Sequence, residues 1–196
     1  MSLSGNCYKV RLLLELLKQP YTWRAVNTRD GETHTPEFLK LNPDGKIPVL
    51  QLENGDTLPE SNAILYYLAE GTSFLPADRW QRAQALRWMF FEQYSHEPDI
   101  AVNRALFLFR DPTGKDDLIQ ANLEKGYAAL DVMERQLQST AFLIGDRMSI
   151  ADISLYAYTH VASDGKFDLQ KYTAIGAWME RITRLPGYVA MTAPIS

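Results

Sequence analysis

Residues 42–50 read NPDGKIPVL, in which a turn signal runs directly into a lysine, an apolar residue and a proline. A proline at the head of a hairpin strand cannot donate a hydrogen bond to the ladder and, if cis, turns the chain sharply. The strand pattern over residues 47–52 then meets Asn54-Gly55, a strong signal for a tight turn. The stretch therefore predicts a β-hairpin whose entry leaves the backbone before the proline free for another partner.

Further elements are predicted on the N-terminal side of the hairpin and directly after it. Apolar residues at spacings of three and four indicate helices, and alternating aromatic and β-branched residues indicate a strand. We expect, in order, a helix over residues 7–18, a strand over 21–27, a short helix from 35, the hairpin, and a helix opened by Glu60-Ser61.

The rest of the chain carries helical periods alone. The expected helices cover residues 79–109 with a bend at Pro98, 123–137, 149–162 and 175–182. The third is apolar nearly all round and should lie at the centre of its domain. We therefore expect an α/β domain over residues 1–71, a linker over 72–78 and an all-α domain over 79–196.

Composition excludes several classes of protein. With 196 residues and a net charge of −4, the chain shows no basic surface for nucleic acid or an anionic membrane. No run approaches the roughly 20 apolar residues of a membrane helix, and the N-terminus lacks the pattern of a signal peptide. The one cysteine allows no internal disulfide. We therefore expect a globular cytoplasmic protein without a nucleic-acid or membrane partner.

Four short motifs occur together in the chain. They are Ser4-Gly5-Asn6-Cys7 before the first helix, NPDGKIPVL over residues 42–50, ESNAI over 60–64, and the pattern GDxxSIAD over 145–152. In this order and spacing they resemble the cytosolic glutathione transferases, over essentially the whole chain. The resemblance implies an α/β thioredoxin-like N-terminal domain with a cis-proline, plus an all-α C-terminal helical domain. It also implies a detoxifying homodimer that uses glutathione as co-substrate and no metal.

Glutathione needs an anion site, a backbone ladder and a group that stabilises its thiolate. Ser61 can offer its hydroxyl and helix N–H groups to the γ-glutamyl carboxylate, and Glu60 can meet the ammonium. A simple helix start is the alternative for both residues. By resemblance, Ile47 before Pro48 pairs its backbone with the cysteinyl part.

The glycyl end of glutathione has two further candidates. Lys46 lies beside the proline turn, and the alternative for it is a solvated lysine. His34 lies one position away from where related enzymes place a polar side chain for this end of the tripeptide.

Ser4 and Cys7 compete for the role of thiol activator. A hydroxyl donor aimed at a thiolate contributes roughly 1.5 to 3 kcal/mol, enough to lower a thiol pKa by a unit. Ser4 matches the serine of theta-like and zeta-like transferases, which favours conjugation. Cys7 matches the cysteine of beta-class enzymes, which favours thiol exchange with disulfides, or it is a small hydrophobe. We favour Ser4, with Cys7 and Asn6 as neighbours of the sulfur.

The pocket for a small hydrophobic electrophile is expected between the two domains, against the long helix after the linker. Tyr94, His96 and Arg104 are its candidates, although most aromatic residues at helical spacing belong to the core. Two alternatives to conjugation remain open. One is glutathione-dependent disulfide reduction through Cys7, and the other is a non-catalytic interaction module of the same fold.

The N-terminus departs from the family pattern. Related chains carry a hydrophobic strand before the catalytic turn, in the middle of the sheet, whereas only Met1, Ser2 and Leu3 precede Ser4. Without that strand the segment 21–27 loses its neighbour, at roughly 1 to 3 kcal/mol for each buried backbone group left unpaired. We therefore expect the native protein to begin upstream of Met1, or to have lost residues there.

Overall fold

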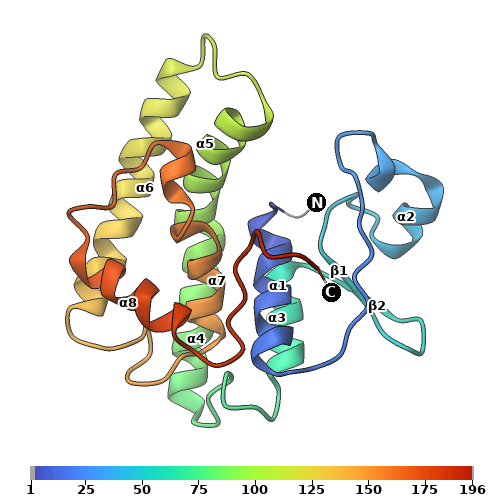
Figure 1. Ribbon diagram of the computed structural model, residues 1–196, viewed down its shortest axis with the longest axis horizontal. Coiled ribbons are helices and arrows are strands. Elements are labelled where there is room, and N and C mark those ends of the chain that lie inside the picture. Colours follow the sequence, from blue (N-terminus) through green and yellow to red (C-terminus); the bar gives the residue numbers. More distant parts are fainter. Residues whose placement is uncertain (1–2, 196) are drawn as a thin grey trace. The chain divides into compact units, whose positions relative to one another are not determined.

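A computed structural model describes residues 3–195 of the chain (Figure 1). The chain forms two compact units, one running through Glu70 and completed by the segment from Leu185 onward, the other spanning Gly71–Arg184. The first boundary lies next to the predicted one. The segment from Leu185 groups with the first unit because its backbone carbonyls bind side chains there: Tyr8 donates to Val189 O at 2.8 Å.

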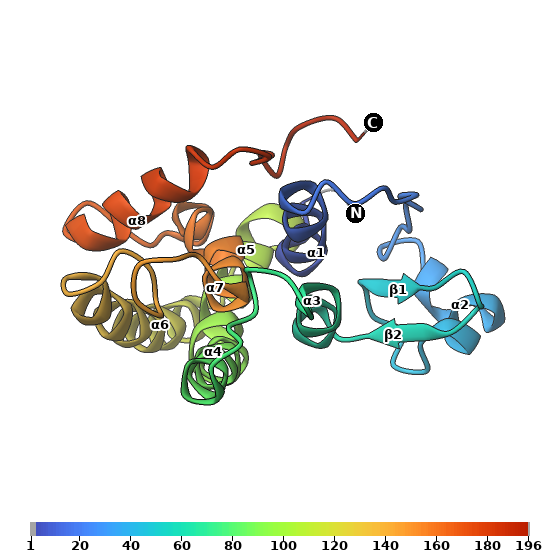
Figure 2. The same ribbon diagram turned by 90° about the horizontal axis from the view of Figure 1, so that it is seen from below.

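The first unit combines helices with a hairpin. Its elements are α1 (Gly5–Leu16), η1 (Glu32–His34), α2 (Pro36–Leu41), β1 (Val49–Gln51), β2 (Thr57–Pro59) and α3 (Ser61–Ala69). The strands pair antiparallel with Leu50 opposite Leu58, and Figure 2 shows them side by side. Helices α1 and α3 pack together around Val10, Leu14 and Ile64. The hairpin predicted from residues 42–58 is confirmed.

The strand predicted over residues 21–27 is wrong. This segment has no regular secondary structure, and among the described residues the sheet consists of β1 and β2 alone. A strand forms only when a neighbouring strand supplies its backbone hydrogen bonds. That neighbour was expected from residues before Ser4. Met1 and Ser2 lie outside the described residues. Tyr21 instead packs against the core between α1 and the hairpin, and its hydroxyl donates to the Glu15 carboxylate at 2.7 Å.

The second unit is all-helical, as predicted. Its elements are α4 (Arg79–Phe91), the π-helical segment η2 (Glu92–His96), α5 (Glu97–Phe109), α6 (Asp116–Leu137), α7 (Ile150–Thr159), η3 (Ala162–Gly165) and α8 (Thr173–Thr183). Pro98 lies at the start of α5, directly after the π-helical segment. Because proline lacks an N–H and its ring clashes with the carbonyl four residues earlier, the helix widens there into the π pattern.

Helix α7 forms the centre of the second unit. All ten of its residues are buried, and Figure 2 shows it among α4, α5 and α6. Its N-terminus is held by a capping box within the motif at residues 145–152: Ser149 Oγ accepts from the Ala151 N–H, and Asp152 accepts from the Ser149 N–H at 2.8 Å. Asp152 also accepts from Leu143 N–H and the Trp178 indole. Burial raises the pKa of Asp152 despite these bonds.

Within residues 3–195, no helix combines the length and apolar character that crossing a membrane requires. The same residues contain no group of three or more His, Cys, Asp or Glu side chains placed to hold a metal ion.

Candidate functional site

The site begins at the N-terminus of α1, where Ser4 is the N-cap. Its Oγ accepts a hydrogen bond from the Cys7 N–H at 3.3 Å, so Ser4 satisfies one of the helix's open backbone donors. In that bond the hydroxyl is the acceptor, so the bond itself does not use the hydroxyl proton. The structural and the functional interpretation of Ser4 are therefore compatible.

Cys7 lies in the first turn of α1 and is 4% exposed. Burial raises the pKa of its thiol, and the hydrogen bond from Ser4 opposes this only in part. With a raised pKa the Cys7 thiol is protonated near neutral pH, and burial shields it. The nucleophilic form of cysteine is the thiolate. These properties fit a small hydrophobe better than a thiol that exchanges with disulfides.

A buried network joins the beginnings of α1 and α3. The Ser61 hydroxyl donates to Asn6 Oδ1 at 3.1 Å, and it accepts from Lys9 Nζ at 3.4 Å. Sequence reasoning selected Asn6 and Ser61 but missed Lys9. A signal was present, because Lys9 stands four residues before Leu13 and therefore on the apolar face of its helix. The network therefore joins the N-terminus of α1, where the thiol of glutathione is expected, to the N-terminus of α3, where its γ-glutamyl end is expected.

Glu60 precedes α3 with φ 69° and ψ 108°, a left-handed conformation that non-glycine residues seldom adopt. Its side chain makes no capping hydrogen bond to α3 and is exposed. The Glu60 carboxylate therefore does not start the helix through a capping hydrogen bond. Such backbone conformations cost energy and concentrate at ligand sites.

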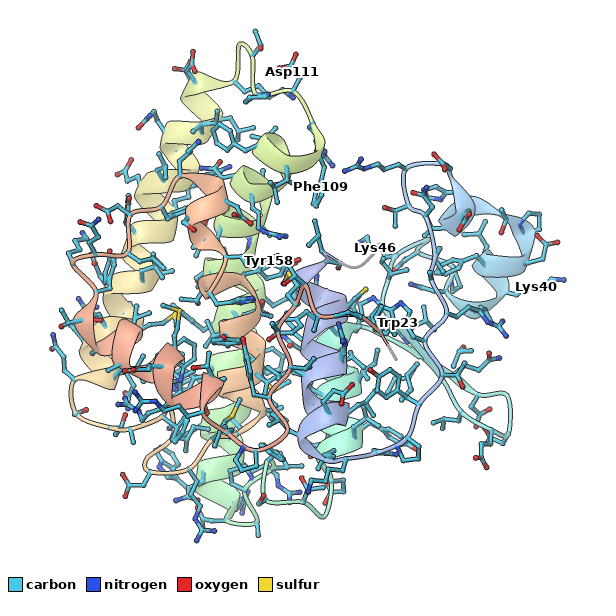
Figure 3. All side chains as sticks on the ribbon, viewed as in Figure 1. Trp23, Lys40, Lys46, Phe109, Asp111 and Tyr158 are labelled. Atoms are coloured by element: carbon cyan, nitrogen blue, oxygen red, sulfur yellow. The ribbon has the colours of Figure 1, made fainter. Side chains whose placement is uncertain are left out.

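The Ile47–Pro48 peptide bond is cis, which confirms the prediction made by resemblance. The preceding loop is held from within, because the Asn42 side chain donates to Lys46 O at 2.9 Å. Lys46 itself has an exposed side chain (Figure 3). The loop thus presents Lys46 and the cis-proline from a fixed backbone.

His34 contacts this same loop. A Cβ built on Gly45 would lie 2.7 Å from the His34 ring, and Gly45 has φ 61°. Only glycine fits at this position, since a side chain would displace the ring and strain the backbone. The His34 ring therefore lies against the loop that carries Lys46, the other residue predicted for the glycyl end.

The three residues predicted for the electrophile are not brought together. Tyr94 is 87% exposed, whereas His96, two residues later in η2, is fully buried. His96 Nε2 lies 2.9 Å from the Thr159 hydroxyl, which itself donates to Leu155 O. His96 is therefore the donor in that contact and belongs to the interior of the helical unit.

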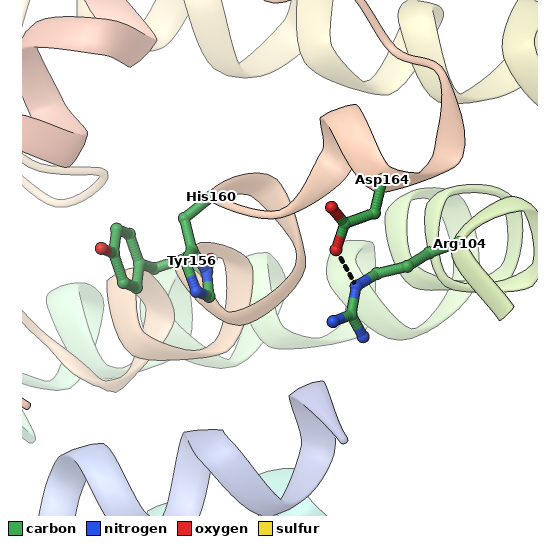
Figure 4. Close-up of polar contacts among 4 residues, drawn as sticks. All are labelled: Arg104, Tyr156, His160 and Asp164. Atoms are coloured by element: carbon green, nitrogen blue, oxygen red, sulfur yellow. Dashed lines mark hydrogen bonds and ion pairs between the residues drawn. The ribbon is translucent and has the colours of Figure 1, made fainter. Parts of the chain in front are cut away.

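Arg104 is buried on α5 and donates from Nε to Asp164 Oδ2 at 2.9 Å (Figure 4). Beside it, the His160 ring stacks on Tyr156 with centroids 4.5 Å apart, and its Nδ1–H donates to the Tyr156 carbonyl at 2.7 Å. Burial lowers the pKa of His160, so its ring is neutral at physiological pH. His160 is stacked and hydrogen-bonded within its own unit, and it is partly buried.

Comparison with known protein families gives two matches along the chain. The family model described as the glutathione S-transferase N-terminal domain matches residues 3–70, and the one described as the glutathione S-transferase C-terminal domain matches residues 98–186.

Individual relatives agree with these matches. The disulfide-bond oxidoreductase YfcG of Escherichia coli is 31% identical over 188 residues, covering 92% of this chain and 87% of that protein. A glutathione S-transferase structure from Pseudomonas fluorescens is 53% identical, with TM-score 0.96 and coverage of 98% and 96%. A Burkholderia graminis glutathione transferase with two glutathione molecules bound per subunit is 27% identical, with TM-score 0.84 and coverage of 94% and 82%.

Proposed function

The chain belongs to the glutathione S-transferase family, and from that premise we propose that it joins the thiolate of glutathione to a small hydrophobic electrophile. The observation that carries the proposal is the hydrogen bond from Ser61 to Asn6. It connects the N-terminus of α3, suited to a carboxylate, with the N-terminus of α1, suited to a thiolate. Both ends of one tripeptide can therefore be bound within a single unit.

Glutathione would lie across this unit with its γ-glutamyl end at α3. The Ser61 hydroxyl and the first N–H groups of α3 receive the carboxylate, and the Glu60 carboxylate receives the ammonium. The backbone of Ile47, before the cis-proline, pairs with the cysteinyl part. Lys46 and His34 meet the glycyl carboxylate from the adjoining loop.

Ser4 is the proposed catalytic residue. Its Oγ accepts from the Cys7 N–H, and its proton, directed at the Cys7 thiol in the free protein, turns to the sulfur of glutathione in the proposed complex. That bond favours the thiolate, and each unit of pKa lowering corresponds to about 1.4 kcal/mol. The thiol proton leaves to solvent, the sulfur forms a bond to an electrophilic carbon, and a leaving group such as halide departs with its electron pair.

Disulfide reduction through Cys7 is the second candidate. The name of the Escherichia coli relative favours it. The burial of Cys7 and its raised thiol pKa disfavour it, because exchange begins with attack by an accessible thiolate. We therefore place conjugation first.

The electrophile is proposed to contact the helical unit. Tyr94 is the exposed one of its three candidates, whereas the buried contacts of His96 with Thr159 and of Arg104 with Asp164 favour structural roles for those two residues. We further propose a cytoplasmic homodimer that acts in detoxification. Support for the dimer comes from α4 and η2, where Trp80 and Phe90 are each 70% exposed and Tyr94 follows one turn later. Exposed aromatic side chains of this kind fit contact with a second copy of the chain.

Two measurements test the proposed function. Glutathione at saturation should raise the melting temperature, because a ligand that binds only the folded state stabilises it. Conjugation of a halogenated aromatic compound should follow the release of halide. A protein without a glutathione-induced shift would be an interaction module rather than an enzyme, and one that reduces glutathione mixed disulfides only when Cys7 is present would support the second candidate.

A further inference from the structure

Lys9 is a fully buried basic residue of the first unit, and forming a helix does not by itself require a lysine to be buried. It lies on α1 and is 0% exposed, among apolar neighbours that include Leu12 and Leu13. Lysine is almost never fully buried unless its charged end has a partner. Its Nζ donates to Ser61 Oγ at 3.4 Å, across from α1 to the first residue of α3. The Lys9 ammonium group thus lies inside the first unit and contacts one hydroxyl of the proposed site.

The hydrogen bonds around Ser61 fix the direction of its hydroxyl. Because one lone pair of Oγ accepts from Lys9, the Ser61 proton points away from the lysine and is donated to Asn6 Oδ1 at 3.1 Å. The three groups form a relay in which each bond polarises the next. A bound carboxylate can take the Ser61 proton while Lys9 still donates to the same oxygen.

Two positive features converge on this hydroxyl. The N-terminus of α3 carries the partial positive charge of a helix end, and the Lys9 ammonium adds a full charge about one hydrogen-bond length from Ser61 Oγ. Charge-assisted hydrogen bonds are roughly twice as strong as neutral ones. The combination selects an anionic group at Ser61.

We propose that Lys9 is a positioning residue that sets the preference of this site for the γ-glutamyl carboxylate of glutathione. It acts through Ser61, whose hydroxyl it orients, and through its charge. The proposal rests on the proposed function and deepens it, because it names the residue through which the α3 end of the site recognises a carboxylate.

Arg11 provides an internal contrast on the same helix. It is also buried, but its guanidinium donates to the carbonyls of Ala193 and Pro194 at 2.9 and 2.7 Å. Its bonds hold the segment after Leu185 and reach neither Asn6 nor Ser61 in the contacts described for it. Removing the charge of Arg11 should loosen the unit without changing recognition of the carboxylate, which makes Arg11→Met the matched control for Lys9→Met.

The test measures Kd by calorimetry for glutathione and for an analogue whose γ-glutamyl carboxylate is converted to an amide. Lys9→Met should weaken glutathione about 10-fold, Lys9→Arg should restore most of the affinity, and Arg11→Met should lower the melting temperature with little change in Kd. For the amide analogue, Lys9→Met should change Kd by less than about 2-fold, since the variant and the amide remove the same interaction. In turnover, KM for glutathione should rise while kcat at saturation is kept.

Three results would overturn the proposal. They are a Lys9→Met variant that binds glutathione as the wild type does, an equal loss for glutathione and the amide, and an equal loss in Arg11→Met. If Lys9→Met does not fold, Lys9→Gln removes the charge while keeping a donor, and the same split between the two ligands is required of it. A wild type that binds glutathione while Lys9→Met is unaffected refutes this role alone, whereas a wild type that binds none refutes the proposed function.

Discussion

Two helix N-termini in this protein are built from the same residue types and used differently. At α7, Ser149 and Asp152 bind each other, and Asp152 also accepts from the Leu143 N–H and the Trp178 indole within the same unit. At α3, Glu60 occupies the N-cap position but its side chain makes no capping hydrogen bond, and the Ser61 hydroxyl belongs to a network with Asn6 and Lys9. A serine beside an acid therefore indicates a helix start, and only the surrounding contacts tell whether that start is structural or open to a ligand.

The largest effect is expected from Asp152→Ala, which removes the acceptor for the Ser149 N–H, the Leu143 N–H and the Trp178 indole. Each buried donor left without a partner costs about 1–3 kcal/mol, so the free energy of unfolding should fall by about 3 kcal/mol or more. Urea denaturation measures the loss. Glutathione affinity of the remaining folded protein should be unchanged, and a selective loss of that affinity would contradict the separation of the two helix starts.

Ser4→Ala should lower kcat/KM for conjugation by about 10- to 100-fold, because the donor to the glutathione sulfur is lost. Loss of the N-cap should also destabilise the protein by about 1 kcal/mol. Cys7→Ala is the control, with conjugation within a few-fold of the wild type. Halide release under steady-state conditions compares the variants. Greater inactivation by Cys7→Ala than by Ser4→Ala would reverse their assigned roles.

Ser61→Ala tests the open helix start directly. We expect glutathione to bind about 10-fold more weakly, and the free energy of unfolding to fall by only about 1 kcal/mol. Calorimetric titration and urea denaturation on the same preparation give both numbers. The comparison with α7 would fail if Ser61→Ala unfolded the protein as strongly as Asp152→Ala while the affinity remained intact.

The Cys7 thiol predicts a change of stability with pH. Burial raises its pKa in the folded state, while the thiol of an unfolded chain ionises near ~8.5. This contribution to stability is fully present below the unfolded-state pKa and is lost as pH rises through the folded-state pKa. Melting temperatures from pH 7 upward should therefore decline more steeply in the wild type than in Cys7→Ala. If the melting temperatures of the wild type and Cys7→Ala declined in parallel with pH, burial would not raise the pKa of the Cys7 thiol.

The smallest effect is expected from Glu60→Gly. Relief of the left-handed conformation at φ 69° should stabilise the protein by up to about 1 kcal/mol, while loss of the carboxylate weakens glutathione binding. Glu60→Gln separates the two effects, because it keeps the backbone strain and removes only the charge. Glutathione affinity equal to the wild type in both variants would exclude Glu60 from the site.

Local signals predicted much of this molecule. The turn at residues 42–45, the Asn54-Gly55 hairpin signal and the helix start at Ser149 depend on neighbours in sequence, and each element forms where it was expected. The cis form of the Ile47–Pro48 bond came from the resemblance, as sequence chemistry alone leaves both isomers open.

Predictions that depended on distant partners succeeded less often. Residues 21–27 have the composition of a strand, but a strand exists only when a second strand supplies its hydrogen bonds. Tyr94 and His96 were both assigned to the electrophile pocket, yet they differ completely in exposure. Lys9 was overlooked because a lysine within a helical pattern is usually solvated, and its burial follows from the packing of α1 on α3.

The central claim is that the beginnings of α1 and α3 form one glutathione site. Calorimetric titration of glutathione into the wild type and Ser61→Ala, with Asp152→Asn as the structural control, tests it most directly. We predict saturable binding to the wild type, about 10-fold weaker binding to Ser61→Ala, and wild-type affinity in folded Asp152→Asn. Absence of binding to the wild type, or equal affinity in the wild type and Ser61→Ala, would contradict the account.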